Sequence, residues 1–158
     1  MGSENGDYPR GVDQRPAAAP SVAPPLRGGC LCGGVRFEVI EPLVSASYCH
    51  CTRCQRRTGT AASAQAALAP GSLRILQGEE LVRAFAPPGG WAKLFCSNCG
   101  SALFSRSRDE PPRWTVRLGA FDGDPGIRPQ LRHHVETAAV WEPLPDDGLP
   151  RYEGPAPA

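Results

Sequence analysis

Seven cysteines in three close groups constrain the fold of this chain more than any other feature of its sequence. Cys30 and Cys32 form the first group, Cys49, Cys51 and Cys54 the second, and Cys96 and Cys99 the third. An odd number of cysteines leaves one thiol unpaired in a disulfide framework, whereas closely spaced pairs in a reducing compartment are typical of metal sites. We therefore favour metal binding over disulfide bonds.

The number of sulfur atoms predicts two metal sites of different kinds. A structural zinc site takes four ligands in a tetrahedron, and two cysteine pairs supply one such set. The C-x-C-x-x-C group at Cys49, Cys51 and Cys54 is the one local cluster that offers three ligands. A site with three protein ligands leaves its fourth position for an exchangeable group. Four cysteines would thus stabilise the fold, and three would hold a reactive metal.

Composition and hydrophobic pattern predict one small, mainly β domain. The chain has 158 residues, which suit a single domain, and its 18 Gly and 18 Pro disfavour long helices. Val35, Phe37 and Val39 alternate with small or polar residues, as in a half-buried strand. Further strands are expected at 44–48, 61–68, 73–77, 81–86, 93–95, 102–105, 114–118 and 131–135. The one expected helical turn, at 52–58, wraps the second cysteine group.

The two ends of the chain differ in composition from its centre. Residues 1–26 are rich in Pro and Ala without a periodic apolar pattern, so we expect a disordered tail there. The zinc domain is expected at 27–153, and a flexible tail at 154–158.

Charge and hydropathy argue against two classes of partner. The net charge of +1 gives no electrostatic signature for nucleic acid. No apolar run approaches the roughly 20 residues that span a bilayer, and the first ten residues are polar, unlike a signal peptide. We expect a soluble, cytoplasmic protein with neither nucleic acid nor a membrane as its partner, and its oligomeric state stays open.

Three cysteine-containing segments, taken in order, resemble one known family. They read G-G-C-L-C-G-G-V-R-F-E-V at 28–39, Y-C-H-C-T-R-C-Q-R-R-T-G-T at 48–60 and F-C-S-N-C-G-S-A-L-F at 95–104. A later segment at 133–152, H-H-V-E-T-A-A-V-W-E-P-L-P-D-D-G-L-P-R-Y, adds a His-containing strand, a Trp and a D-G-L-P turn. Together they resemble the glutathione-dependent formaldehyde-activating enzyme family, also called the CENP-V/GFA domain.

The resemblance implies a fold, a division of the cysteines and a reaction. The fold is a β-tent of small antiparallel sheets with little helix, built around two zinc ions per chain. The structural zinc would be bound by Cys30, Cys32, Cys96 and Cys99, and the catalytic zinc by Cys49, Cys51 and Cys54. The reaction is that of a zinc-dependent carbon-sulfur lyase, in which a small-molecule thiol such as glutathione combines reversibly with formaldehyde to give S-(hydroxymethyl)glutathione.

Polar residues beside the second cysteine group are the candidate substrate contacts. Arg53 and Arg56 carry guanidinium groups, which match carboxylates in a bidentate fork, and Gln55 can add neutral hydrogen bonds. The alternative is that the arginines, Arg57 included, only offset the negative charge of the thiolates.

The histidines leave open whether the second site is open or closed. His133 is a candidate acid, base or ligand, and any of His50, His133 or His134 can instead supply a fourth ligand and close the site. His50 lies between two cysteines of an extended C-x-C, so its side chain should point to the opposite side. His133 and His134 fall in a predicted strand, so their rings should face opposite ways.

Three other functions compete with this hypothesis. A non-catalytic zinc module for interactions needs no open metal position. An enzyme of the same fold can act on a different small molecule. A zinc fold like that of the methionine sulfoxide reductases needs a redox cysteine outside the metal sites, and all seven cysteines are already assigned.

Overall fold

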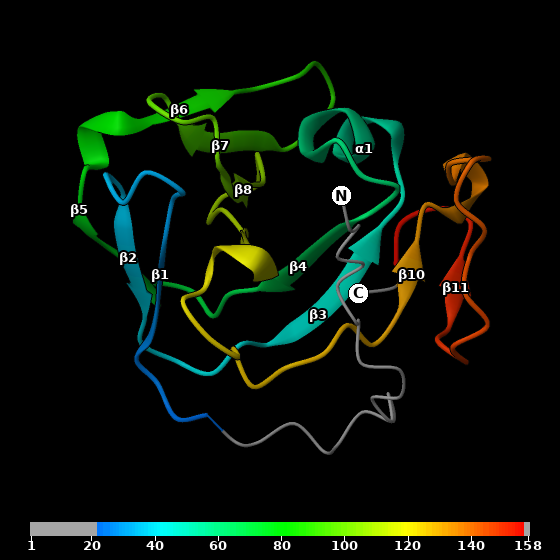
Figure 1. Ribbon diagram of the computed structural model, residues 1–158, viewed down its shortest axis with the longest axis horizontal. Coiled ribbons are helices and arrows are strands. Elements are labelled where there is room, and N and C mark those ends of the chain that lie inside the picture. The colour runs from blue at the N-terminus through cyan, green and yellow to red at the C-terminus, as the bar shows by residue number, and fades with distance from the viewer. Residues whose placement is uncertain (1–21, 157–158) are drawn as a thin grey trace, which may run out of the picture.

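Two β-sheets share one core in the computed structural model, which describes residues 22–156 (Figure 1). The smaller sheet has the order β1-β2-β5, with β1 at Leu26–Gly29, β2 at Arg36–Val39 and β5 at Leu73–Gln77. The larger sheet has eight strands in the order β11-β10-β3-β4-β9-β8-β7-β6. The predicted mainly β fold with antiparallel sheets and little helix is confirmed.

The remaining elements are short. The strands of the larger sheet are β3 (Ser45–Cys49), β4 (Ser63–Ala67), β6 (Val82–Phe85), β7 (Ala92–Cys96), β8 (Ala102–Arg106), β9 (Trp114–Arg117), β10 (Arg132–His133) and β11 (Arg151–Tyr152). The helices are α1 (Thr52–Thr58) and three single 3-10 turns, η1 (Glu79–Leu81), η2 (Leu118–Ala120) and η3 (Val135–Thr137). Within residues 22–156, none of these helices has the length and apolar character needed to cross a membrane.

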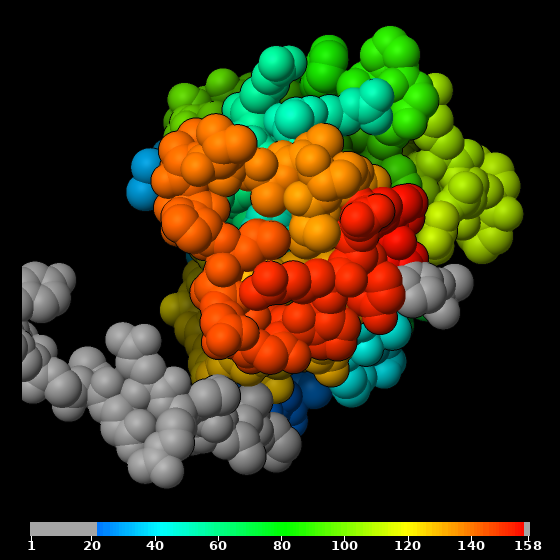
Figure 2. Space-filling model, turned by 90° about the vertical axis from the view of Figure 1, so that its right-hand side faces the viewer, coloured from blue at the N-terminus to red at the C-terminus, as the bar shows by residue number. Residues whose placement is uncertain are grey.

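One edge of the larger sheet has a topology that the sequence did not predict. β10 pairs in parallel with β3 on one side and with β11 on the other, whereas the other strand pairs of this sheet are antiparallel. Figure 2 shows the C-terminal segment, in orange and red, spread over this side of the molecule with α1 above it. Of the predicted tails, residues 1–21 and 157–158 lie outside the described residues.

The core lies between the two sheets and is built around aromatic rings. Phe37 of β2 is fully buried, and its ring meets that of Phe104 in β8 edge to face at a centroid distance of 5.0 Å. A second edge-to-face contact joins Phe37 to Phe121 at 5.7 Å. Gly28 of β1 packs so closely here that an added Cβ would lie 2.4 Å from the Phe37 ring. Only glycine therefore allows β1 this approach.

The two faces of the larger sheet have opposite character. Its apolar face carries the register partners Ala46, Ala66, Val116, Phe104 and Leu94. Three register pairs place polar side chains on the other face: Cys49 with Ser63, Gln65 with Arg117, and Lys93 with Ser105. Partners in register point to the same side, so these six side chains form one polar face across five strands. Arg57 of α1 donates a hydrogen bond to Ser105 Oγ at 3.1 Å, which places α1 over this polar face.

Replacing Phe37 by alanine should destabilise the protein more than replacing an exposed phenylalanine. Phe37→Ala removes a fully buried ring and is expected to lower the free energy of unfolding by about 3–5 kcal/mol. Phe85→Ala removes a side chain that is 62% exposed and serves as the control. Urea denaturation with excess zinc measures both, and equal midpoints for the two variants would contradict this description of the core.

Candidate metal centres and substrate pocket

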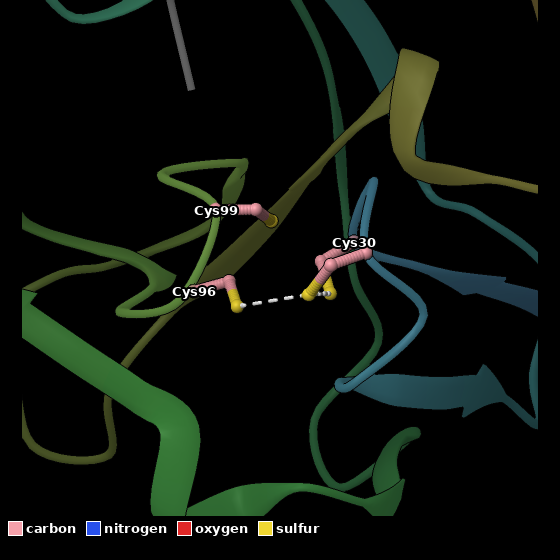
Figure 3. A group of neighbouring side chains, drawn as sticks. Cys30, Cys96 and Cys99 are labelled. Carbon is pink, nitrogen blue, oxygen red and sulfur yellow. Dashed lines mark hydrogen bonds between the residues drawn. The ribbon is translucent and has the colours of Figure 1, made fainter.

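The first candidate metal centre is a cluster of four cysteines from two distant parts of the chain. Cys30 and Cys32 lie in the turn after β1. Cys96 ends β7, and Cys99 lies in the turn between β7 and β8; Figure 3 shows Cys30, Cys96 and Cys99 side by side. All four Sγ atoms lie within 4.8 Å of one another. A zinc tetrahedron with bonds of about 2.3 Å places its sulfurs about 3.8 Å apart. The Sγ distances of 3.4 Å from Cys30 to Cys32 and 3.9 Å from Cys32 to Cys96 fit such an ion.

Tight turns and hydrogen bonds build this cluster. The Cys30 carbonyl accepts from Gly33 N–H at 3.0 Å, and the Cys96 carbonyl accepts from Gly100 N–H at 2.8 Å. Both glycines have positive φ, which other residues rarely adopt. The Ser101 hydroxyl lies 3.2 Å from Cys99 Sγ, and this hydrogen bond is the main cause that lowers the pKa of the Cys99 thiol to about 5. The turn therefore favours the thiolate, the form that binds metal.

The second candidate centre is the three-cysteine cluster at the start of α1. Cys49 ends β3, Cys51 is the N-cap residue of α1, and Cys54 lies in its first turn. Their Sγ atoms all lie within 4.8 Å of one another; Cys49 and Cys54 are buried, and Cys51 is partly exposed. Sulfur hydrogen bonds from Cys49 and then Cys54 lower the pKa of Cys51 far below the ordinary thiol range. The helical turn predicted at 52–58 is therefore what brings the three sulfurs together.

No histidine completes the three-cysteine cluster. Among residues 22–156, no imidazole nitrogen lies with the three sulfurs at ligand spacing. His50 is buried with its Nε2 3.2 Å from Arg132 Nη1, on the other side of the strand as expected. His133 is the register partner of Cys49, and its buried Nε2 has no hydrogen-bond partner in the part of the chain that the structure describes. The cluster thus offers three protein ligands.

The prediction that His133 and His134 face opposite ways is wrong. The strand β10 ends at His133, and His134 takes the left-handed conformation with φ of 56°. The two rings consequently lie side by side, with centroids 5.2 Å apart. His134 Nδ1 lies 3.2 Å from Glu136 Oε1 instead of pointing across the sheet.

The predicted substrate contacts on α1 differ in how many hydrogen bonds they already make. Gln55 Nε2 donates to the carbonyls of His50 at 2.6 Å and Thr137 at 2.7 Å, so it ties α1 to η3. Arg53 Nη2 donates to the Pro88 carbonyl at 3.1 Å. Arg56 is exposed, and its side chain makes no hydrogen bond within residues 22–156. Arg56 is therefore the most available of the three for a ligand.

A cavity of about 430 Å³ lies between α1, β6 and β7. Its cationic members are Arg53, Arg56, Arg57 and Lys93, and its apolar wall includes Phe85, Pro87 and Phe95. None of the described residues that line it is acidic. The cavity is suited to a small anionic molecule with an apolar part.

A second cavity of about 500 Å³, beside Trp141, is less suited to an anion. Its arginine, Arg132, is already engaged: Nη2 donates to Asp147 Oδ2 at 2.6 Å and Nη1 faces His50. Arg132 is also the register partner of Tyr48, which alternates with Cys49, so it faces away from the cysteine side.

Three cations beside the three cysteines are candidate site residues that the sequence did not single out. Arg117 is 5% exposed, and Lys93 and Arg57 are half-buried. Burial is the main cause that lowers the pKa of Arg57 to about 9, with a smaller effect of Arg117 that Cys54 opposes. Lys93 and Arg117 fall in predicted strands. The alternation of apolar and polar residues in those strands does not show that α1 covers the face on which these two side chains lie. Arg57 belonged to the predicted basic group without being distinguished from its neighbours.

Comparison with known proteins agrees with this geometry. Residues 25–137 match the family profile described as "Glutathione-dependent formaldehyde-activating enzyme". A Halomonas elongata protein named "Putative glutathione-dependent formaldehyde-activating enzyme" is 30% identical over 129 residues, which cover 73% of this chain and 78% of that protein. A crystal structure of a Rhodobacter sphaeroides protein shares the fold, with a TM-score of 0.54 and 24% identity over 80% of this chain and 99% of that one. The chain therefore belongs to the glutathione-dependent formaldehyde-activating enzyme family.

Proposed function

We propose that this protein is a zinc-dependent carbon-sulfur lyase that joins a small thiol to an aldehyde and reverses that reaction. Glutathione and formaldehyde, which give S-(hydroxymethyl)glutathione, are the reactants that family membership favours. The observation that carries the proposal is the three-cysteine cluster, which no histidine among residues 22–156 closes. A purely structural or interaction module has no need of such an open cluster.

The two clusters would hold zinc in different roles. Four thiolates around one ion form a closed structural site, which links the turn after β1 to the turn after β7. A zinc ion at the three-cysteine cluster, when bound, supplies a Lewis acid that favours the thiolate form of a thiol substrate.

The cationic cavity would bind the charged ends of the substrate. Glutathione carries a carboxylate at each end, and a guanidinium pairs with a carboxylate through two parallel hydrogen bonds. Arg56 has its donors available, and Arg53 lies one turn away on the same helix. Binding both ends fixes the thiol in place, and such positioning is a large part of catalysis.

His133 is suited to handle the proton of the reaction. When S–H adds across C=O, the sulfur bonds to carbon and the thiol proton ends on the carbonyl oxygen. His133 lies beside Cys49 on the face that α1 covers, and its Nε2 makes no hydrogen bond within the described residues. We propose that this nitrogen takes the proton from the thiol and delivers it to the oxygen.

Metal analysis should distinguish the two clusters. We expect about two zinc ions per chain in the wild type and about one in each of Cys54→Ser and Cys99→Ser, because each variant removes one ligand of a different cluster. Only Cys99→Ser should lower the melting temperature strongly, since its cluster joins distant parts of the chain. Mass-spectrometric metal analysis and calorimetry measure both quantities. Full zinc content in Cys54→Ser would refute the second site.

Exchange NMR on glutathione and formaldehyde tests the reaction itself. The zinc-loaded wild type should accelerate exchange between the free reactants and the adduct, whereas Cys54→Ser at equal concentration should not. The variant controls for spontaneous addition and for nonspecific protein effects. No acceleration by the wild type would favour a different substrate or an interaction module.

Arg56 should affect substrate binding more than turnover. Arg56→Met removes a cation from the cavity and is expected to raise KM for glutathione about tenfold, with kcat changed less than about twofold. Arg74→Met is the matched control, because Arg74 is exposed on β5 of the other sheet. Steady-state kinetics on both variants separates the two effects, and an unchanged KM in Arg56→Met would remove Arg56 from the site.

A further inference from the structure

One serine holds together two arginines between α1 and the larger sheet, the buried Arg117 and the half-buried Arg57. Ser105 Oγ accepts a hydrogen bond from Arg57 Nη1 at 3.1 Å and another from Arg117 Nη2 at 2.6 Å. Arg57 Nη2 also donates to the carbonyls of Leu94 at 2.6 Å and Phe104 at 2.9 Å. Like charges repel, so the protein must use these hydrogen bonds to hold two guanidinium groups at one buried point.

No carboxylate in the part of the chain that the structure describes offsets the charge of these cations. The ion pairs within residues 22–156 involve other cations, and none includes Arg57, Lys93 or Arg117. Within residues 22–156, the side chains that accept a hydrogen bond from Arg117 are Ser105 and Gln65, a neutral amide. Burying a cation without an anion is strongly unfavourable, so a partner of negative charge is needed.

The three cysteines are the anionic groups that the fold places beside these cations. Cys49 lies on the same polar face as Gln65 and Arg117, because its partner Ser63 is two residues from Gln65 on β4. Cys54 and Arg57 lie one turn apart on α1, which covers that face. The register thus brings the arginine pair and the cysteine cluster together.

We propose that Arg57 and Arg117, held by Ser105, are positioning residues that set the charge of the three-cysteine site, so that its free position selects an anionic ligand over a neutral one. The inference rests on the proposed function, in which that ligand is the thiolate of the substrate. The inference names the residues that would favour a thiolate over water or an imidazole as the fourth ligand of the three-cysteine site.

The charges of the two clusters show why only one needs such residues. Three thiolates and a divalent ion would carry −1, whereas Arg57, Lys93 and Arg117 together carry +3, so the region has a net positive charge before a ligand binds, and an anionic ligand reduces it. The four-cysteine cluster has no free position, and its nearby cation Arg36 is already paired with Asp122. The cations are therefore placed where a further ligand can enter.

The test compares an anionic and a neutral ligand on the cobalt-substituted protein. Cobalt(II) at cysteine sites has visible absorption that changes when a fourth ligand binds, so thiocyanate and imidazole can each be titrated without any turnover. In the wild type we expect thiocyanate to bind more tightly than imidazole. Arg117→Met should reduce this preference about tenfold, since it removes one nearby charge. Arg117→Lys should retain most of it.

Two further variants keep the result interpretable. Ser105→Ala removes the shared acceptor of both arginines and should lower the preference in the same direction, even if Arg117→Met folds poorly. Arg132→Met is the matched control: Arg132 is 7% exposed, similar to Arg117 at 5%, but lies on the opposite face of the sheet. Its loss should lower stability without changing the ratio of the two affinities.

The outcomes separate this inference from the proposed function. An unchanged ratio in both Arg117→Met and Ser105→Ala, or an equal change in Arg132→Met, would overturn the inference even if exchange NMR shows the reaction. Failure of the wild type to bind either ligand would overturn it as well. A lost preference in Arg117→Met and Ser105→Ala alone would support it, even if glutathione and formaldehyde prove to be the wrong reactants.

Discussion

The hydrogen bonds from Arg57 to β7 and β8 fix the position of α1, and the proposed active site depends on that position. α1 has only seven residues and would be unstable alone, so its place on the sheet must come from such contacts. With Arg57 anchored to the Leu94 and Phe104 carbonyls, Cys54 meets Cys49 and Cys51, and Arg53 and Arg56 reach the cationic cavity. Gln55 secures the other side of the helix through its bonds to the His50 and Thr137 carbonyls.

The two faces of the larger sheet have different roles: one contributes to stability, and the other carries the proposed active site. Its apolar face packs against Phe37 and supplies the hydrophobic burial on which a domain of this size depends. Its other face holds charged side chains out of water, which is unfavourable unless hydrogen bonds and opposite charges compensate. Ser105 lies on β8 as an acceptor for two arginines, while its neighbour Phe104 belongs to the core. Two adjacent residues of β8 thus contribute to the hydrophobic core and to the proposed active site, respectively.

Local spacing explains what could be predicted, and distant pairing explains what could not. The cysteine groups, the helical turn at 52–58 and most strands follow from residues within a few positions of one another. The parallel pairing of β10 and the cluster of Lys93, Arg57 and Arg117 depend on which strands become neighbours, and one sequence does not show this. The orientation of His134 was mispredicted because a single left-handed residue ends the strand.

The order of the residues along the chain has a consequence for biosynthesis. A protein emerges from the ribosome N-terminus first. Cys49, Cys51 and Cys54 lie within one short segment, so a nascent chain displays all three thiols before β7 and β9 have been made. The cations Lys93 and Arg117 follow later, and His133 comes last, on β10. A metal ion captured early would meet three thiols with Arg57 nearby but without Lys93 and Arg117, and the site would acquire its full selectivity only when the sheet closes around it.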